Sequence, residues 1–118
     1  MRKLSGVLLT TLAALLVACN SPSAPKSDAE LHLTPQQAHG RHLYDQHCLA
    51  CHEAYNSGGQ HGPTMQGVFQ KKYLPSGAPA NDERTRDAIL TGRAKMPGFR
   101  DALSPSDTDD LIAYMHTL

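Results

Sequence analysis

Cys48, Cys51 and His52 carry the clearest chemistry that this sequence offers. They form a C-x-x-C-H motif, in which two thiols lie about one helical turn apart. At that spacing both sulfurs can form thioether bonds with the vinyl groups of one porphyrin, and the adjacent imidazole can bind its iron. The motif therefore predicts a covalently attached haem, with Cys48 and Cys51 as attachment points and His52 as an axial iron ligand.

Two other kinds of site use a C-x-x-C pair. A thioredoxin-like redox pair requires a βαβ context, and the sequence shows no such alternation. A zinc site requires further ligands. His61 could supply a third ligand, but no second Cys or His pair follows at zinc-finger spacing. Haem attachment is therefore the favoured interpretation.

Met96 is the favoured second axial ligand. A thioether is a soft, neutral ligand that favours reduced iron and raises the reduction potential. Pro97 restricts the backbone of Met96 towards extended conformations, which suits a loop that faces a ring. Met65 and His61 are the alternatives, and His61 would give a bis-imidazole site of lower potential.

The N-terminus predicts export and lipid attachment. Arg2 and Lys3 precede an apolar run from Leu4 to Val17, which has the form of a secretory signal. This run is shorter than the ~20 apolar residues of a membrane-spanning helix. The sequence Leu-Val-Ala-Cys that ends at Cys19 resembles a bacterial lipoprotein signal, in which cleavage precedes a lipidated cysteine. Cleavage after Ala18 that leaves Cys19 as a plain thiol is the alternative.

The sequence divides into a signal peptide at 1–18, a lipidated flexible tether at 19–33 and one folded domain at 34–118. The tether is rich in Ser, Pro, Ala and Lys and lacks a sustained apolar period. The whole chain has 11 basic and 11 acidic residues, so removal of the two basic residues in the signal leaves 9 against 11, a net charge of −2. Without a basic excess, we expect no nucleic-acid partner.

The folded domain is expected to be all-α. Thr34, with Pro35 and Gln37, predicts the start of a helix that runs towards Cys48. The following segment is rich in Gly and Pro and is expected to be mostly loop, with a short helix in the range 65–72.

Two further helices are expected in the C-terminal half. Asn81 is the predicted N-cap of a helix at 82–91, which Gly92 would end. The last helix is capped by Ser104, with Pro105 in its first turn and Asp107 completing the capping pattern. Its apolar face consists of Leu111, Tyr114, Met115 and Leu118.

At this point the sequence resembles the small class I c-type cytochromes, over about residues 35–118. The matching residues are Gly40 and Tyr44, the C-x-x-C-H motif, Gly62-Pro63, Met96-Pro97-Gly98-Phe99, and Leu111 with Tyr114. The resemblance implies an all-α cytochrome c fold, with terminal helices that cross near Gly40 and Tyr114 and loops around one covalent haem c. It also implies that the backbone carbonyl of Pro63 accepts a hydrogen bond from His52.

The expected function is one-electron transfer between respiratory redox partners that bind transiently. With both axial positions filled by His52 and Met96, the iron offers no open position, so neither enzymatic turnover nor a small-molecule substrate is expected. A lipid on Cys19 would hold the protein on a bacterial membrane facing the periplasm, and Asn20 slightly favours the outer membrane. The alternatives are a haem-based ligand sensor or peroxidase-like enzyme with an open or labile sixth site, and a fixed electron-transfer subunit of a dehydrogenase or oxidase complex.

Overall fold

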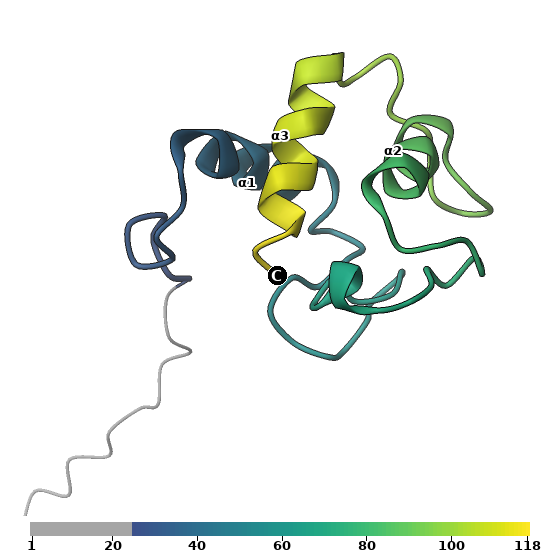
Figure 1. Ribbon diagram of the computed structural model, residues 1–118, viewed down its shortest axis with the longest axis horizontal. Coiled ribbons are helices and arrows are strands. Elements are labelled where there is room, and N and C mark those ends of the chain that lie inside the picture. The colour runs from purple at the N-terminus through teal and green to yellow at the C-terminus, as the bar shows by residue number, and fades with distance from the viewer. Residues whose placement is uncertain (1–24) are drawn as a thin grey trace, which may run out of the picture.

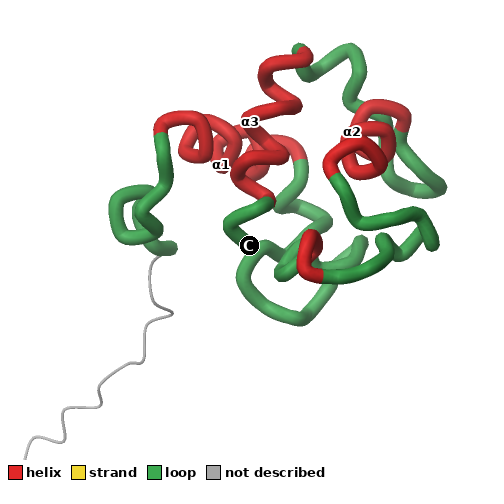
Figure 2. The backbone as a smooth tube through the Cα atoms, viewed as in Figure 1, coloured by secondary structure: helices red, strands yellow, loops and turns green. Residues whose placement is uncertain are grey.

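A computed structural model describes residues 25–118. In this range the chain forms three α-helices, α1 (Pro35–His47), α2 (Asp82–Thr91) and α3 (Pro105–Met115), and one short 3-10 helix, η1 (Val68–Gln70). Figure 1 shows α1 and α3 side by side, with α2 on the other side of the domain and a long loop between α1 and η1. Figure 2 shows no strand in the described residues, so the all-α prediction is confirmed.

The helices begin where their capping residues predict. Thr34 and Gln37 form a complete capping box at α1, and Ser104 and Asp107 form another at α3. Asn81 accepts a hydrogen bond from the backbone of Arg84 at the start of α2. These side chains satisfy backbone N–H groups that have no partner inside the first turn.

The ends of two elements differ from the sequence expectation. The short helix expected in 65–72 is only the three-residue η1, because Gly67 precedes it with φ +62 and Lys71 follows in extended conformation. Leu118 lies beyond α3, although it is half-buried against the same core as Leu111 and Met115.

Helices α1 and α3 make their closest approach at Gly40. A Cβ at this position would overlap the backbone carbonyl oxygen of Asp110, so only glycine allows this crossing. One turn further along, the rings of Tyr44 and Tyr114 meet edge to face, with 5.4 Å between centroids and 66° between planes. Both rings are fully buried and lie at the centre of the core.

Contacts between side chains hold α2 and η1 against the end of α3. The imidazole of His116 lies 2.7 Å from the carboxylate of Asp82 and stacks on Phe69 with 3.9 Å between ring centroids. Arg86 and Asp109 form an ion pair between α2 and α3. The His116 ring is exposed, and its contacts join three elements.

The signal peptide and Cys19 lie outside the described residues. Within the segment expected to be a tether, residues 27–33 form a hydrogen-bonded turn, in which the N–H of Leu33 donates to the carbonyl of Asp28 (3.0 Å). The Arg41 guanidinium of α1 donates to the Asp28 carboxylate (2.7 Å). Across residues 25–118, none of the helices has the length and apolar character that crossing a membrane would require.

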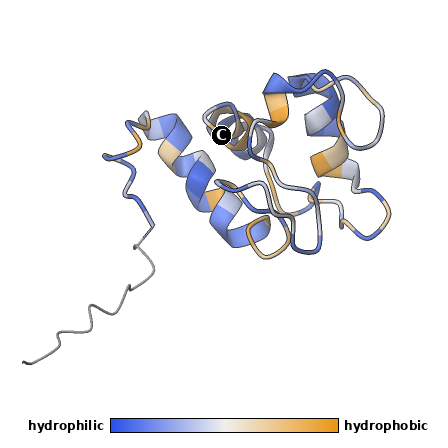
Figure 3. Ribbon diagram, turned by 90° about the horizontal axis from the view of Figure 1, so that it is seen from below, coloured by the Kyte–Doolittle hydropathy of each residue, from blue (hydrophilic) through white to orange (hydrophobic). Residues whose placement is uncertain are grey.

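The core is small. Figure 3 shows hydrophilic residues along most of the described ribbon, with hydrophobic residues in short stretches. Within residues 25–118, the largest fully buried side chains are Tyr44, Tyr114, Leu111 and Thr108. Several large apolar side chains remain half-buried around this core, namely Met65, Phe69, Leu74, Met96 and Phe99. A further apolar group would therefore add much to the buried centre of a domain of this size.

Candidate functional site

The C-x-x-C-H motif forms a tight turn that continues directly from α1. The backbone N–H of Cys48 donates to the carbonyl of Tyr44 (2.8 Å), and the N–H of His52 donates to the carbonyl of Cys48 (2.9 Å). Cys48 is half-buried against the core and Cys51 is exposed, and neither is in a disulfide. The turn therefore leaves two unbonded thiols beside the histidine.

The imidazole of His52 is oriented by the loop that follows the motif. Its Nδ1 lies 2.7 Å from the carbonyl oxygen of Pro63, which is the contact that the family resemblance implies. Because a carbonyl oxygen can only accept, Nδ1 carries the proton and donates it. In the neutral imidazole this leaves Nε2 without a proton, which is the form that binds a metal.

Gly62 allows this loop to lie directly against the imidazole. A Cβ on Gly62 would lie 2.5 Å from Cε1 of His52 and 2.9 Å from its Nδ1. The N–H of Gly62 also donates to the carbonyl of Cys51 (2.9 Å). The Gly62-Pro63 pair thus fixes the ring by both contact and hydrogen bonding, as an outer partner of a metal-binding histidine commonly does.

The backbone of His52 is held by a second residue. The hydroxyl of Tyr44 donates to the His52 carbonyl oxygen at 2.7 Å. Burial raises the pKa of Tyr44, so its hydroxyl keeps its proton and remains a donor. The family motif drew attention to Tyr44 for packing, but nothing in the sequence indicated this bond.

Met96 lies in a tight turn that packs against the end of α2. The backbone groups of Arg93 and Met96 bond to each other in both directions, at 3.0 and 2.9 Å. Gly92 has φ +74, and a Cβ there would lie 2.6 Å from the Met96 carbonyl oxygen, so this return of the chain requires glycine. The Met96 side chain is half-buried and contacts the core.

Direct bonds bring His52 and Pro63 together beside the two cysteines. In the described residues, the segment that carries Met96 reaches α1 through an aromatic contact instead. Phe99 meets the ring of His47 edge to face, with 5.7 Å between centroids, and His47 immediately precedes Cys48. The N–H of Phe99 also donates to the carbonyl of Ile89 in α2 (3.0 Å), which fixes the segment.

The alternative iron ligands Met65 and His61 belong to the loop that holds His52. The N–H of Met65 donates to the carbonyl of Glu53, the residue after His52 (2.8 Å). His61 is exposed and immediately precedes Gly62, whose backbone contacts the His52 ring. Both residues therefore belong to the loop that contacts the His52 segment.

The thiol-redox and zinc interpretations receive no support from the site. Burial, together with the nearby Cys51, raises the pKa of Cys48 to about 11, whereas reactive redox thiols have lowered pKa values. Across residues 25–118, no three His, Cys, Asp or Glu side chains converge as ligands of one metal ion.

The residues present fit a haem of the c type. Two thiols would supply the covalent attachments, and an imidazole and a half-buried thioether would supply the donor set. Half-buried apolar side chains that pack around the core, Leu74 and Phe99 among them, supply a surface for a porphyrin. When bound, this haem supplies a one-electron iron couple that no side chain can replace.

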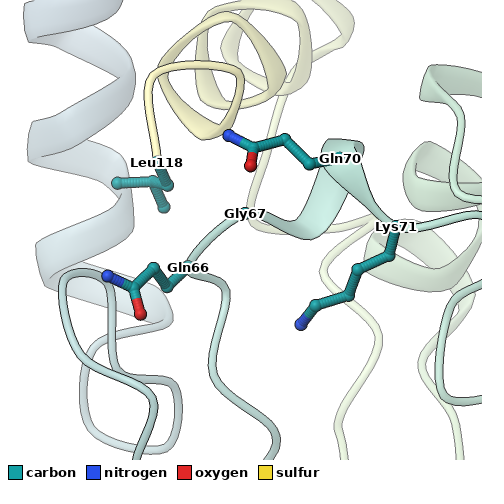
Figure 4. Close-up of a pocket in the computed structure, with 5 residues that line it drawn as sticks. All are labelled: Gln66, Gly67, Gln70, Lys71 and Leu118. Atoms are coloured by element: carbon teal, nitrogen blue, oxygen red, sulfur yellow. The ribbon is translucent and has the colours of Figure 1, made fainter.

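The pocket in Figure 4 lies elsewhere. It is open, has a volume of about 440 Å³ and is lined by Gln66, Gly67, Gln70, Lys71 and Leu118. None of the candidate site residues lines it. Its lining combines two amides and one ammonium group with the side chain of Leu118.

Two of the curated relatives are much longer than this chain. A dihydro-heme d1 dehydrogenase of Pseudomonas aeruginosa is 38% identical over 82 residues, which cover 68% of this chain and 15% of that protein. A cytochrome bc1 complex cytochrome c subunit of Corynebacterium diphtheriae is 38% identical over 79 residues, covering 66% and 26%. The chain thus spans about a quarter or less of these two proteins.

A third relative is close to this chain in size. Cytochrome c6 of a Nostoc species is 24% identical over 115 residues, covering 98% of this chain and 92% of that protein. Residues 35–115, nearly the whole described domain, match the family model described as cytochrome C oxidase, cbb3-type, subunit III. The chain therefore belongs to this family of cytochrome c domains, and its cofactor is a covalently attached haem c.

Proposed function

We propose that this protein is a one-electron carrier whose haem iron is bound by His52 and Met96. A cytochrome c domain implies electron transfer with redox partners. The observation that carries the assignment of His52 is its imidazole, with Nδ1 bonded to the Pro63 carbonyl and Nε2 left to bind iron. Cys48 and Cys51 would hold the porphyrin covalently beside it.

We choose Met96 as the second axial ligand because it belongs to a different segment from the other two candidates. Two axial ligands must approach the iron from opposite faces of the porphyrin. Met65 and His61 belong to the loop that bonds to the His52 segment, whereas Met96 comes from a separate turn after α2. That turn is closed by two backbone hydrogen bonds and contacts the end of α1 through Phe99 and His47, so it could present the thioether from the other side.

Carbon monoxide binding distinguishes a carrier from a sensor or enzyme. If His52 and Met96 fill both axial positions, the reduced protein at neutral pH will show no change in its visible spectrum when carbon monoxide is added. Rapid, stoichiometric binding would refute the carrier and favour a ligand sensor or a peroxidase-like enzyme with an open sixth position.

A fixed subunit of a larger redox complex is the second candidate. Two relatives favour it, because one is named as a complex subunit and the other as a dehydrogenase that is several times longer than this chain. The cytochrome c6 relative, which is of similar length, favours a separate carrier. Purification from detergent-solubilised native membranes decides between them, since a carrier is recovered alone and a subunit with its complex.

We further propose that Cys19 carries lipid and that residues 19–33 tether the domain to a bacterial membrane. Bacterial c-type cytochromes are extracytoplasmic, which agrees with an export signal at 1–18. A lipid anchor would raise the local concentration of the carrier near membrane-bound partners. The outer membrane is slightly favoured by Asn20.

The Cys19→Ser variant tests this anchor. Expressed in an exporting bacterium, the native chain will float with membranes in a density gradient, and its N-terminal peptide will carry acyl mass. Cys19→Ser will lack the acyl mass and leave the membrane fraction. An unmodified N-terminal cysteine on the native, processed chain would refute lipidation.

A further inference from the structure

Tyr44 and Tyr114 are a matched pair of tyrosines whose hydroxyl groups have different partners. Each is 1% exposed, and their rings contact each other edge to face in the core. The hydroxyl of Tyr44 donates to the His52 carbonyl (2.7 Å), whereas the hydroxyl of Tyr114 bonds to that of the exposed Tyr55 (2.6 Å). Packing accounts for both rings but does not account for where the Tyr44 hydroxyl points.

We propose that the Tyr44 hydroxyl is a positioning group for His52 that raises the reduction potential of the haem. The proposal rests on the assignment of His52 as an iron ligand. His52 is then held from two directions, with its ring fixed by the Pro63 carbonyl and its backbone fixed by α1. In residues 25–118, Tyr44 is the only hydrogen-bond donor to the His52 carbonyl oxygen.

The sign of the effect follows from the orientation of the dipoles. The hydroxyl proton, which is the positive end of its dipole, points at the peptide of the iron ligand. Oxidation adds one positive charge at the iron, so this dipole disfavours the oxidised state. Without the hydroxyl, the carbonyl oxygen loses its partner and its negative end favours oxidised iron. Removing the hydroxyl therefore lowers the reduction potential in two ways, by removing its own dipole and by leaving the carbonyl oxygen without a partner. The low dielectric of the protein interior strengthens both effects.

Tyr44→Phe and Tyr114→Phe test the proposal as a pair. Each keeps a buried ring and removes one hydrogen bond, so both variants should lose similar stability in denaturant titrations of the holoprotein. Tyr44→Phe should raise the ratio of oxidised to reduced haem at a fixed electrode potential about threefold, which is ~28 mV at 59 mV per tenfold. Tyr114→Phe should leave this ratio unchanged.

The two variants separate positioning from packing. A lowered potential in Tyr44→Phe alone supports the proposal. An unchanged potential in Tyr44→Phe, or an equal change in both variants, overturns it and leaves only a structural role. Failure of the His52 assignment would be seen independently. In that case His52→Ala holoprotein would keep the low-spin spectrum of the wild type, whatever the two tyrosine variants do.

Discussion

Replacing Met96 with alanine is expected to abolish the weak far-red sulfur-to-iron absorption of the oxidised protein and to lower its reduction potential by on the order of 100 mV, within the ~0.8 V range that axial ligands span. The thioether favours reduced iron, and water or a stronger donor that replaces it favours oxidised iron. The visible spectrum and a redox titration of the purified variant measure both effects. Reduced Met96→Ala should also gain carbon monoxide binding.

Met65→Ala is the matched control for Met96→Ala. Both methionines are half-buried against the same core, so both substitutions remove a similar amount of packing. Met65→Ala should keep the far-red absorption and the wild-type potential. If Met65→Ala lost the absorption and Met96→Ala kept it, the axial ligand would be Met65. If both variants kept the far-red absorption, neither methionine would be the axial ligand.

Gly40→Ala is expected to reduce the free energy of unfolding by about 2 kcal/mol, even though alanine is the better helix former by ~1 kcal/mol. The added Cβ would overlap the backbone carbonyl oxygen of Asp110. A flexible side chain could move aside, but the backbone of α3 can move only if the two helices separate. Because the same crossing buries Tyr44 and Tyr114, separating the helices would also disturb the packing of these two rings at the centre of the core.

Gly58→Ala provides the control for Gly40→Ala. A Cβ on Gly58 would meet only a side-chain oxygen, that of Asn56 at 3.2 Å, in an exposed loop. The free energy of unfolding should therefore change by less than ~0.5 kcal/mol. Denaturant unfolding of the holoproteins, followed by far-ultraviolet circular dichroism, measures both values. A Gly40→Ala variant as stable as the wild type would contradict the close crossing of α1 and α3.

The helices were predictable because the signals that define them are local. A capping residue and its partner three positions later bond within one turn, as Thr34 and Gln37 do in α1 and Ser104 and Asp107 do in α3. The length of η1 was less predictable, since it depends on the left-handed conformation that Gly67 adopts in the fold. The sequence shows that Gly67 can adopt a left-handed conformation, but it does not show whether the fold requires one.

Contacts between segments that are far apart in the chain could not be predicted from the sequence. The imidazole of His116 reaches Asp82 and Phe69, which lie 34 and 47 positions earlier, and its surroundings at the end of α3 gave no sign of this. The bond from the Tyr44 hydroxyl to the His52 backbone depends on how the turn after α1 returns to the helix. No periodicity in the sequence encodes that geometry.

In the candidate site, too, some features could be predicted from the sequence and others could not. Cys48, Cys51 and His52 are contiguous, so their common role could be inferred from spacing alone. The partner of the His52 ring came from family resemblance, and the Pro63 carbonyl lies at hydrogen-bonding distance as that resemblance implied. Met96 lies 44 positions after His52, and its role as the second axial ligand stays a prediction.

Mass spectrometry of the proteolytic peptide that contains Cys48, Cys51 and His52 tests the covalent haem site most directly. Protein matured in a host that attaches c-type haem should yield this peptide with the mass of one haem added and with neither thiol open to alkylation. The same peptide recovered without added mass, with both thiols alkylated, would contradict the covalent site and the electron-carrier function that depends on it.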